Sequence, residues 1–321
     1  MLHLVALHLI LKQEGVCVFT SNKDDLDKGG TGVIDTIENG ILKAVVKLTG
    51  AELVSLKSCD EQLEYLWQDD ADSYSGHSPL LFPIVGSLPD DRYTYEGVSY
   101  EMGLHGFGSQ LKFDLVEKQM DMLFYQTQYN HETLQQYPFK FKLGIRYALV
   151  KKMLIIRFEI TNLDKGIMLF SIGAHPFFRC PLGQDEDISD YMLIFEKPET
   201  VKRRIKEGSL LTGETEDFLN QSREVKLSHS LFDRGAIILE GTRSKWVEMR
   251  NPNHKKAVRV YYTGFPYLGI WSFGDSPFVC IEPWCGIDST FGDSHDLTKK
   301  EGLLKLNPRA SFTCEYRIKV I

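Results

Sequence analysis

The feature that most constrains the fold of this chain is a succession of short apolar or alternating segments separated by residues that favour turns. Four pairs of such segments are each joined by a short connection: 92–95 with 98–100, 146–150 with 153–160, 246–250 with 258–262, and 267–273 with 278–281. The connections include Glu96-Gly97 in the first pair and Asn251-Pro252-Asn253 in the third. Such spacing is typical of β-hairpins, so the sequence predicts an antiparallel β-sheet protein.

The rest of the chain fits the same class. Segments 41–46 and 53–56 are expected to be strands, and 311–320 is expected to be the closing strand. Residues 199–221 are more polar and are expected to form a loop or one short helix. Neither a repeated unit nor a regular alternation of strands and helices is visible. We therefore predict an all-β fold, a large and mainly antiparallel β-sandwich, as a single domain over residues 35–321, with less than about a fifth of its residues helical.

Residues 1–34 are predicted to be an N-terminal extension, to which no role is assigned. The apolar run at 2–11 is shorter than the ~20 residues that a membrane-spanning helix needs. No Lys or Arg precedes this run and no small-residue cleavage site follows it, which disfavours a signal peptide. Residues 21–32 are rich in Asp, Lys and Gly and are expected to be a linker.

Composition argues against several classes of partner. The 321 residues include 37 Lys and Arg against 44 Asp and Glu, which gives a net charge of −7 without a basic stripe. Such a chain is not expected to bind nucleic acid or an anionic membrane surface. Its six cysteines show no Cys-x-x-Cys pair and no zinc-like spacing with histidine. Reduced thiols in a cytoplasmic protein are the simpler interpretation.

Three positions combine a titratable side chain with unusual backbone neighbours: His105, His175 and Glu282, the last two each directly before a proline. Proline disfavours a helical conformation in the residue before it, so His175 and Glu282 are expected to be extended and to lie at strand ends beside a cleft. A carboxyl group among apolar neighbours has a raised pKa and, facing a histidine, can act as a general base. Taken singly, each position also fits a structural role, and it is their occurrence together that points to chemistry.

Other chemistries lack their motifs. The sequence has no G-x-S-x-G element, no phosphate-binding loop and no dinucleotide fingerprint. His131-Glu132 lacks the second histidine of a zinc-binding helix, and no His-x-His pair is present. Neither a metal nor an organic cofactor is therefore predicted. A glycosidase-like carboxylate pair, Glu282 with Asp233 or Asp288, stays open on spacing alone.

Five short segments follow one another along the chain: 79–86 (PLLFPIVG), 104–107 (LHGF), 173–178 (GAHPFF), 231–234 (LFDR) and 281–284 (IEPW). In this order they resemble the aldose 1-epimerase (galactose mutarotase-like) family, nearest its lactose-operon-associated, LacX-type branch. The resemblance extends over about residues 35–321. It implies a β-supersandwich, which agrees with the hairpins above.

The resemblance implies a role for individual residues in opening and closing a sugar ring. Glu282 matches the general base that takes the proton from the anomeric C1 hydroxyl, and His175 matches the general acid that protonates the ring oxygen. His105 matches a second histidine on the ring-oxygen side. Asp233 matches an acidic residue that binds sugar hydroxyls, and Trp284 is expected to contact the same substrate.

The chain departs from the family at one position. The family often has an arginine just after the Phe-Pro-containing segment, where it contacts the sugar, and here that position is Ser87. Arg92 is a candidate substitute for substrate binding, with a solvated place on the predicted hairpin as the alternative. Weaker binding of simple hexoses is expected unless Arg92, Arg179 or another donor reaches the cleft.

The sequence thus predicts an isomerase, an aldose 1-epimerase that interconverts the α and β anomers of a hexose. Within the same class, a hexose-6-phosphate epimerase would need arginines clustered near the pocket mouth. In a different class, a non-catalytic carbohydrate-binding protein would keep the fold and the aromatic side chains without turnover. The presence of Glu282, His175 and His105 argues against that class, because binding alone does not require an acid and a base together.

Overall fold

The structure is a computed structural model that describes residues 33–68 and 76–321. The apolar run at 2–11 and the expected linker at 21–32 lie outside the described residues. Helical structure amounts to 8% of the described residues, below the predicted limit. In the described ranges it consists of α1 (His131–Gln136) and five 3₁₀ turns, η1 (Pro89–Asp91), η2 (Gly108–Gln110), η3 (Ile188–Asp190), η4 (His229–Phe232) and η5 (Leu297–Lys299).

The remaining elements are β-strands. The strands of the first half are β1 (Ile34–Glu38), β2 (Leu42–Lys47), β3 (Glu52–Ser58), β4 (Leu80–Leu81), β5 (Arg92–Tyr95), β6 (Val98–Glu101), β7 (Asp114–Lys118), β8 (Met122–Gln128), β9 (Phe141–Val150) and β10 (Met153–Asn162). Those of the second half are β11 (Met168–Phe170), β12 (Ile172–Ala174), β13 (Phe177–Arg179), β14 (Met192–Glu207), β15 (Leu210–Lys226), β16 (Ile237–Glu240), β17 (Trp246–Arg250), β18 (Ala257–Tyr261), β19 (Tyr267–Trp271), β20 (Phe278–Cys285), β21 (Leu304–Leu306) and β22 (Ser311–Val320).

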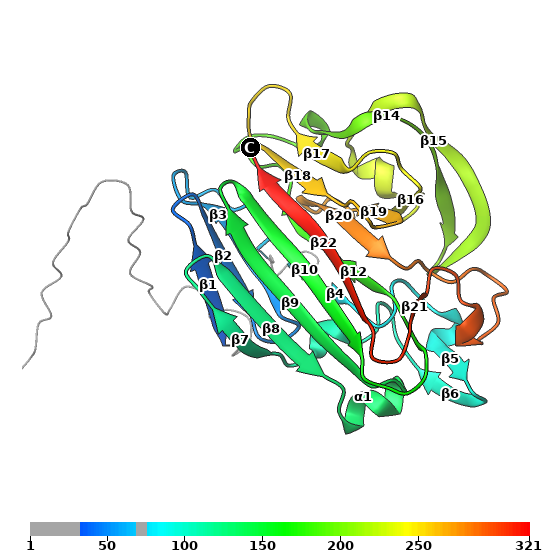
Figure 1. Ribbon diagram of the computed structural model, residues 1–321. Coiled ribbons are helices and arrows are strands. Elements are labelled where there is room, and N and C mark those ends of the chain that lie inside the picture. Colours follow the sequence, from blue (N-terminus) through cyan, green and yellow to red (C-terminus); the bar gives the residue numbers. More distant parts are fainter. Residues whose placement is uncertain (1–32, 69–75) are drawn as a thin grey trace, which may run out of the picture. The chain divides into compact units, whose positions relative to one another are not determined.

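Most of these strands belong to one 15-stranded sheet, whose path runs β4-β12-β20-β19-β16-β14-β17-β18-β22-β10-β9-β8-β7, with β13 beside β20 and β15 beside β14. Smaller sheets are formed by β1-β2-β3, β5-β6 and β11-β21. Figure 1 shows β22, in red, lying between β10 and β18. Because β20 pairs with β12, β13 and β19, segments far apart in the sequence meet along it.

The structure confirms the four predicted hairpins and the closing strand. They are the antiparallel pairs β5–β6, β9–β10, β17–β18 and β19–β20, followed by β22. The side chains alternate between the two faces of the sheet, as strand geometry requires. In β10, every second residue from Leu154 to Asn162 is buried, and the residues between them are partly or fully exposed. The mainly antiparallel β fold predicted from the sequence is therefore the observed one.

Two predictions about local structure were wrong. Residues 199–221 form neither a loop nor a helix, because they lie in the long antiparallel pair β14–β15. Strand β20 does not end before Glu282 but continues through Pro283 to Cys285. Proline lacks a donor but its fixed backbone angle fits an extended chain, so the strand passes through it.

The apolar side chains of the sheets form a core that includes Phe82, Phe141, Phe170 and Tyr137. None of the helices in the described part of the chain has the length and apolar character that crossing a membrane requires. Beside this core, a small cluster of buried residues includes Trp284 of β20 and Val85. The candidate base Glu282 lies in the same strand, two residues before Trp284.

Candidate active site

Glu282 lies in β20, a strand whose eight residues are all buried. Its backbone pairs with Gly269 of β19, and the residue is 1% exposed. Burial raises the pKa of Glu282 well above its usual value of 4.5, because the loss of water penalises the charged form. Trp284 and the charge of Lys206 act in the opposite direction, so the carboxyl group is tuned by neighbours as well as by burial.

His175 lies between β12 and β13, and its Nε2 is 3.2 Å from Oε2 of Glu282. The imidazole stacks on the ring of Phe177, with centroids 4.7 Å apart and planes 13° from parallel, which holds its orientation. Burial lowers the pKa of His175 well below 6.5, and the nearby His105 lowers it further. The neutral imidazole is thus the favoured form.

Glu282 and His175 therefore form a buried acid–base pair. Burial of both groups favours the uncharged pair, with a proton on the carboxyl group of Glu282. A polar ligand that replaces the lost hydration favours the ionised pair, in which Glu282 is a base and His175 an acid. The contact can thus move a proton in each direction between neighbouring atoms of a ligand.

His105 is fixed by the segment that follows β4. Its backbone N–H donates to the carbonyl of Gly86 at 3.0 Å, and its own carbonyl accepts from the N–H of Phe82 at 3.2 Å. Its Nδ1 accepts from the N–H of Gly86 at 3.0 Å, so in the neutral ring the proton is on Nε2. Burial lowers the pKa of His105 to about 3, which makes this ring a neutral N–H donor. It lies beside His175, with ring centroids 5.7 Å apart.

The turn that carries His105 explains the glycine after it. His105 has φ +63° and Gly106 has φ +70°, both in the left-handed region. A Cβ on Gly106 would lie 2.5 Å from the carbonyl oxygen of Phe82. Glycine thus allows the turn to pack closely on the segment after β4 and to present the imidazole to the site.

Trp284 belongs to the same site. It follows Glu282 by two residues in β20, so both side chains project from one face of the strand. Its ring centroid lies 6.3 Å from that of His105. A Cβ on Gly173 would lie 2.9 Å from the indole and one on Gly269 would lie 2.7 Å from it, so the indole packs directly on the two neighbouring strands.

Several buried polar atoms at the site have no hydrogen-bond partner within the described residues. They include Nδ1 of His175 and Oδ2 of Asp288. Such atoms are rare in protein interiors, because an unmade hydrogen bond costs about 1–3 kcal/mol. Their proximity to the Glu282–His175 pair indicates a site for a ligand with several hydrogen-bonding groups.

One charged residue of the site, Lys206, was not predicted from the sequence. Its Nζ lies 3.0 Å from Oδ1 of Asp288, and the same oxygen accepts the backbone N–H of Ser87 at 2.9 Å. Lys206 comes from β14, in the stretch expected to be a loop or helix, and a basic run at 202–206 was the available signal. Asp288, considered above as a partner for Glu282, is 1% exposed and already bound on one oxygen.

The structure does not bring the other two candidates to the acid–base pair. Arg92 lies on the β5–β6 hairpin, where it is exposed and pairs with Asp90 at 3.3 Å. Asp233 is the exposed residue at the end of η4, and its backbone N–H donates to Ser230. Within the described residues, neither side chain has a recorded contact with Glu282, His175 or His105.

The site also contains a group that could hold a metal. Ligand atoms of His175, Cys280 and Glu282 lie within 4.8 Å of one another, and all three residues are buried. A nitrogen, a sulfur and an oxygen ligand suit a zinc-like ion. Burial raises the pKa of the Cys280 thiol well above 9.0, which disfavours the thiolate that such an ion would need. The residues therefore fit a metal poorly.

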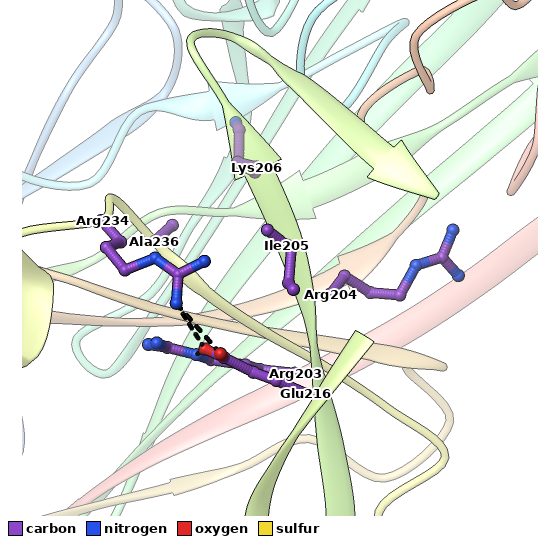
Figure 2. A pocket seen from close by; sticks show the side chains of 7 residues that line it. All are labelled: Arg203, Arg204, Ile205, Lys206, Glu216, Arg234 and Ala236. Carbon is purple, nitrogen blue, oxygen red and sulfur yellow. Dashed lines mark hydrogen bonds and ion pairs between the residues drawn. The ribbon is translucent and has the colours of Figure 1, made fainter. Parts of the chain in front are cut away.

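A small pocket along β14 is lined by seven residues: Arg203, Arg204, Ile205, Lys206, Glu216, Arg234 and Ala236. Figure 2 shows Arg203 and Arg234 directed to Glu216, and Nη1 of Arg234 lies 3.0 Å from Oε2 of that carboxylate. Arg204 pairs with Glu301 at 2.8 Å and with Glu240 at 3.1 Å. The arginines of this pocket thus already have carboxylate partners.

Comparison with known proteins shows where this geometry belongs. A family model described as aldose 1-epimerase matches residues 34–291, a range that includes every site residue above. The chain belongs to the aldose 1-epimerase family. The chromosomal LacX protein of Lactococcus lactis subsp. lactis is 33% identical over 298 residues, which cover 89% of this chain and 98% of that protein. The predicted family and its LacX branch are therefore confirmed.

Solved structures of similar proteins share the aldose 1-epimerase fold. A galactose mutarotase related enzyme from Lactobacillus acidophilus superposes with a TM-score of 0.87 at 32% identity, covering 90% of this chain and 97% of that one. A galactose mutarotase-like protein from Lactobacillus casei gives 0.85 at 30% identity, covering 90% and 100%. Family membership supports an isomerase that acts on carbohydrates.

Proposed function

We propose that this protein is an aldose 1-epimerase that interconverts the α and β anomers of a neutral hexose. The observation that carries the proposal is the buried contact of 3.2 Å between Nε2 of His175 and Oε2 of Glu282. Ring opening requires one proton to leave the C1 hydroxyl and one to reach the ring oxygen, two atoms bonded to the same carbon. An acid and a base in contact with each other match that requirement.

In the proposed reaction, the carboxylate of Glu282 takes the proton from the C1 hydroxyl while His175 gives its proton to the ring oxygen. The electron pair of the breaking C1–O bond stays on the ring oxygen, and C1 becomes an aldehyde carbon. The N–H of His105 donates to the ring-oxygen side and stabilises the charge that develops there. After this step Glu282 holds a proton and His175 is neutral, which is the protonation state that burial favours.

Rotation about the C1–C2 bond then presents the other face of the aldehyde. The ring hydroxyl attacks C1, His175 takes back its proton, and Glu282 protonates the former carbonyl oxygen. The product is the other anomer, and the site returns to its starting state without any net exchange of protons. General acid catalysis and general base catalysis each raise a reaction rate by about 10²–10⁴-fold, so the two groups together can accelerate anomer exchange substantially.

A neutral hexose fits better than a hexose 6-phosphate. The arginines beside the site are engaged by Glu216, Glu240 and Glu301. A phosphate would have to displace these carboxylates to gain paired contacts of its own. We therefore expect free hexoses to be the better substrates.

The test is anomer exchange measured at equilibrium by NMR, with purified protein and a panel of glucose, galactose and their 6-phosphates. The proposed function predicts rapid exchange of at least one free hexose. Faster exchange of a 6-phosphate would identify the alternative epimerase. Binding without exchange for every sugar would identify a non-catalytic carbohydrate-binding protein.

A further inference from the structure

Ser87 occupies the position where the family often has an arginine, and its surroundings show which charged group lies nearby instead. Ser87 is 2% exposed, and its backbone N–H donates to Oδ1 of Asp288 at 2.9 Å. The same carboxylate oxygen lies 3.0 Å from Nζ of Lys206. A lysine from β14, distant in sequence, thus contacts the carboxylate that anchors the Ser87 backbone.

Lys206 is electrostatically close to the acid–base residues. Its charge lowers the pKa of Glu282 and that of His105, so it acts on both sides of the site. Its side chain is 16% exposed, which leaves the charge only partly screened by water. Figure 2 shows Lys206 apart from Arg203, Glu216 and Arg234, whose side chains gather together.

Lys206 and Asp288 together have hydrogen-bonding capacity to spare. An ammonium group has three N–H donors, and within the described part of the chain one hydrogen bond of Lys206 is seen, to Oδ1 of Asp288. Oδ2 of Asp288 is buried without a hydrogen-bond partner among the same residues. A free donor next to a free acceptor is the arrangement that a sugar hydroxyl needs, because a hydroxyl both donates and accepts.

We propose that Lys206 is the substrate-positioning residue of this site, which with Asp288 binds a hexose hydroxyl and supplies from β14 the charged donor that Ser87 lacks. The identity of the ligand as a hexose rests on the proposed function. The two arginines considered from the sequence do not compete for this role: Arg92 is exposed and paired with Asp90, and Arg179 is exposed at the end of β13.

The experiment compares Lys206→Met, Lys206→Arg and the parent by sugar binding and by anomer exchange. Loss of a charged hydrogen bond is expected to raise the Kd and KM of Lys206→Met roughly ten- to hundredfold, with a smaller change in kcat. Lys206→Arg keeps the charge and is expected to stay within about fivefold of the parent in Kd. Lys202→Met is the matched control, since Lys202 lies on the same strand but is 62% exposed and pairs with Asp217.

A charge-balanced variant separates binding from folding. Lys206→Met removes the ammonium group that pairs with the buried Asp288, so Lys206→Met/Asp288→Asn is measured beside it, with thermal unfolding of both. Asparagine keeps an acceptor for the N–H of Ser87. The double variant is expected to unfold near the parent temperature and still to bind the hexose at least tenfold more weakly.

The two proposals fail in different ways. The role of Lys206 is overturned if the parent protein exchanges anomers while a folded Lys206→Met or double variant binds the hexose within twofold of the parent. Parent protein that binds a hexose without exchanging its anomers overturns the proposed function, while weaker binding by the lysine variant still supports the positioning role. Parent protein that binds no hexose overturns both.

Discussion

At the scale of single residues, the proposed reaction depends most on the carboxyl group of Glu282, which is its general base. It is 1% exposed and lies 3.2 Å from His175, and glutamine has nearly its shape. Glu282→Gln is therefore expected to fold as the parent does and to exchange anomers at least about a hundredfold more slowly, the lower end of a general-base contribution. NMR exchange measures the rate, and circular dichroism verifies the fold. Exchange at the parental rate would show that another group is the base.

The same substitution has a pH-dependent effect on stability. The folded pKa of Glu282 lies above its value of 4.5 in the unfolded chain, so the folded state holds this proton more tightly. Its contribution to stability is therefore full below that value and is lost as the pH rises through the folded pKa. Glu282→Gln has no such loss, so we expect its free energy of unfolding, relative to that of the parent, to rise as the pH increases above 4.5. Urea unfolding of both proteins across this range measures the difference, and a constant or shrinking difference would contradict the raised pKa.

Ser87 and Lys206 are coupled through one carboxylate oxygen of Asp288. An arginine at 87 in the parent would bring a second cation to an acceptor already in use, so Ser87→Arg alone is expected to improve hexose binding little. In the Lys206→Met background this oxygen has lost its cation and keeps only the backbone N–H of Ser87, and there Ser87→Arg is expected to recover about tenfold in KM. A double-mutant cycle measures this coupling. Equal effects of Ser87→Arg in both backgrounds would show that the two positions act independently.

At the scale of elements, strand β20 depends on small residues in its neighbours. Gly269 of β19 leaves room for Trp284, and an added Cβ would lie 2.7 Å from the indole. Gly269→Ala is expected to displace Trp284 and to destabilise the fold by about 1–3 kcal/mol, with weaker hexose binding. Gly166→Ala is the control, because a Cβ there meets nothing within 4 Å. Denaturant unfolding and tryptophan fluorescence measure both effects, and parental values for Gly269→Ala would contradict the packing argument.

The elements that the sequence predicted well are those with local signals. Glu96-Gly97 and Lys151-Lys152 set hairpin turns within a few residues of the strands they join, so pattern and turn chemistry agree. The β14–β15 pair was missed although Gly208-Ser209 joins its strands, because both strands are rich in polar residues and their register shifts repeatedly. Pairing in tertiary context overrode a weak local preference there.

The candidate site, like the fold, was predictable only where its residues lie in short segments with a local signal. His175, Glu282 and Trp284 stand in short segments that the resemblance marks, and the structure brings them together with His105. Lys206 lies 82 positions from its partner Asp288 and on a strand that was not foreseen. No spacing rule connects such residues, because their contact depends on the path of the whole sheet.

At the scale of the whole molecule, the predicted boundary near residue 35 is open to direct test. The family model begins at residue 34, and β1 begins at Ile34. We expect a chain that starts at residue 33 to keep the parental melting temperature within about two degrees and to bind and exchange the same sugar, since the described sheets and site residues all lie beyond that point. A lower melting temperature or lost binding would assign residues 1–32 a part in the fold or the site.

A longer deletion gives this test its positive control. Removing residues 1–38 also removes β1, whose five residues pair with β2. It further removes Asp35, which lies 2.7 Å from Nζ of Lys118 and accepts from the hydroxyl of the buried Tyr125 at 3.1 Å. Tyr125 would then be left with an unpartnered hydroxyl beside an uncovered edge of the sheet, at a cost of about 1–3 kcal/mol for the hydroxyl alone. The longer deletion should therefore unfold at a clearly lower temperature than the shorter one, and equal melting temperatures would place the true start of the folded domain after β1.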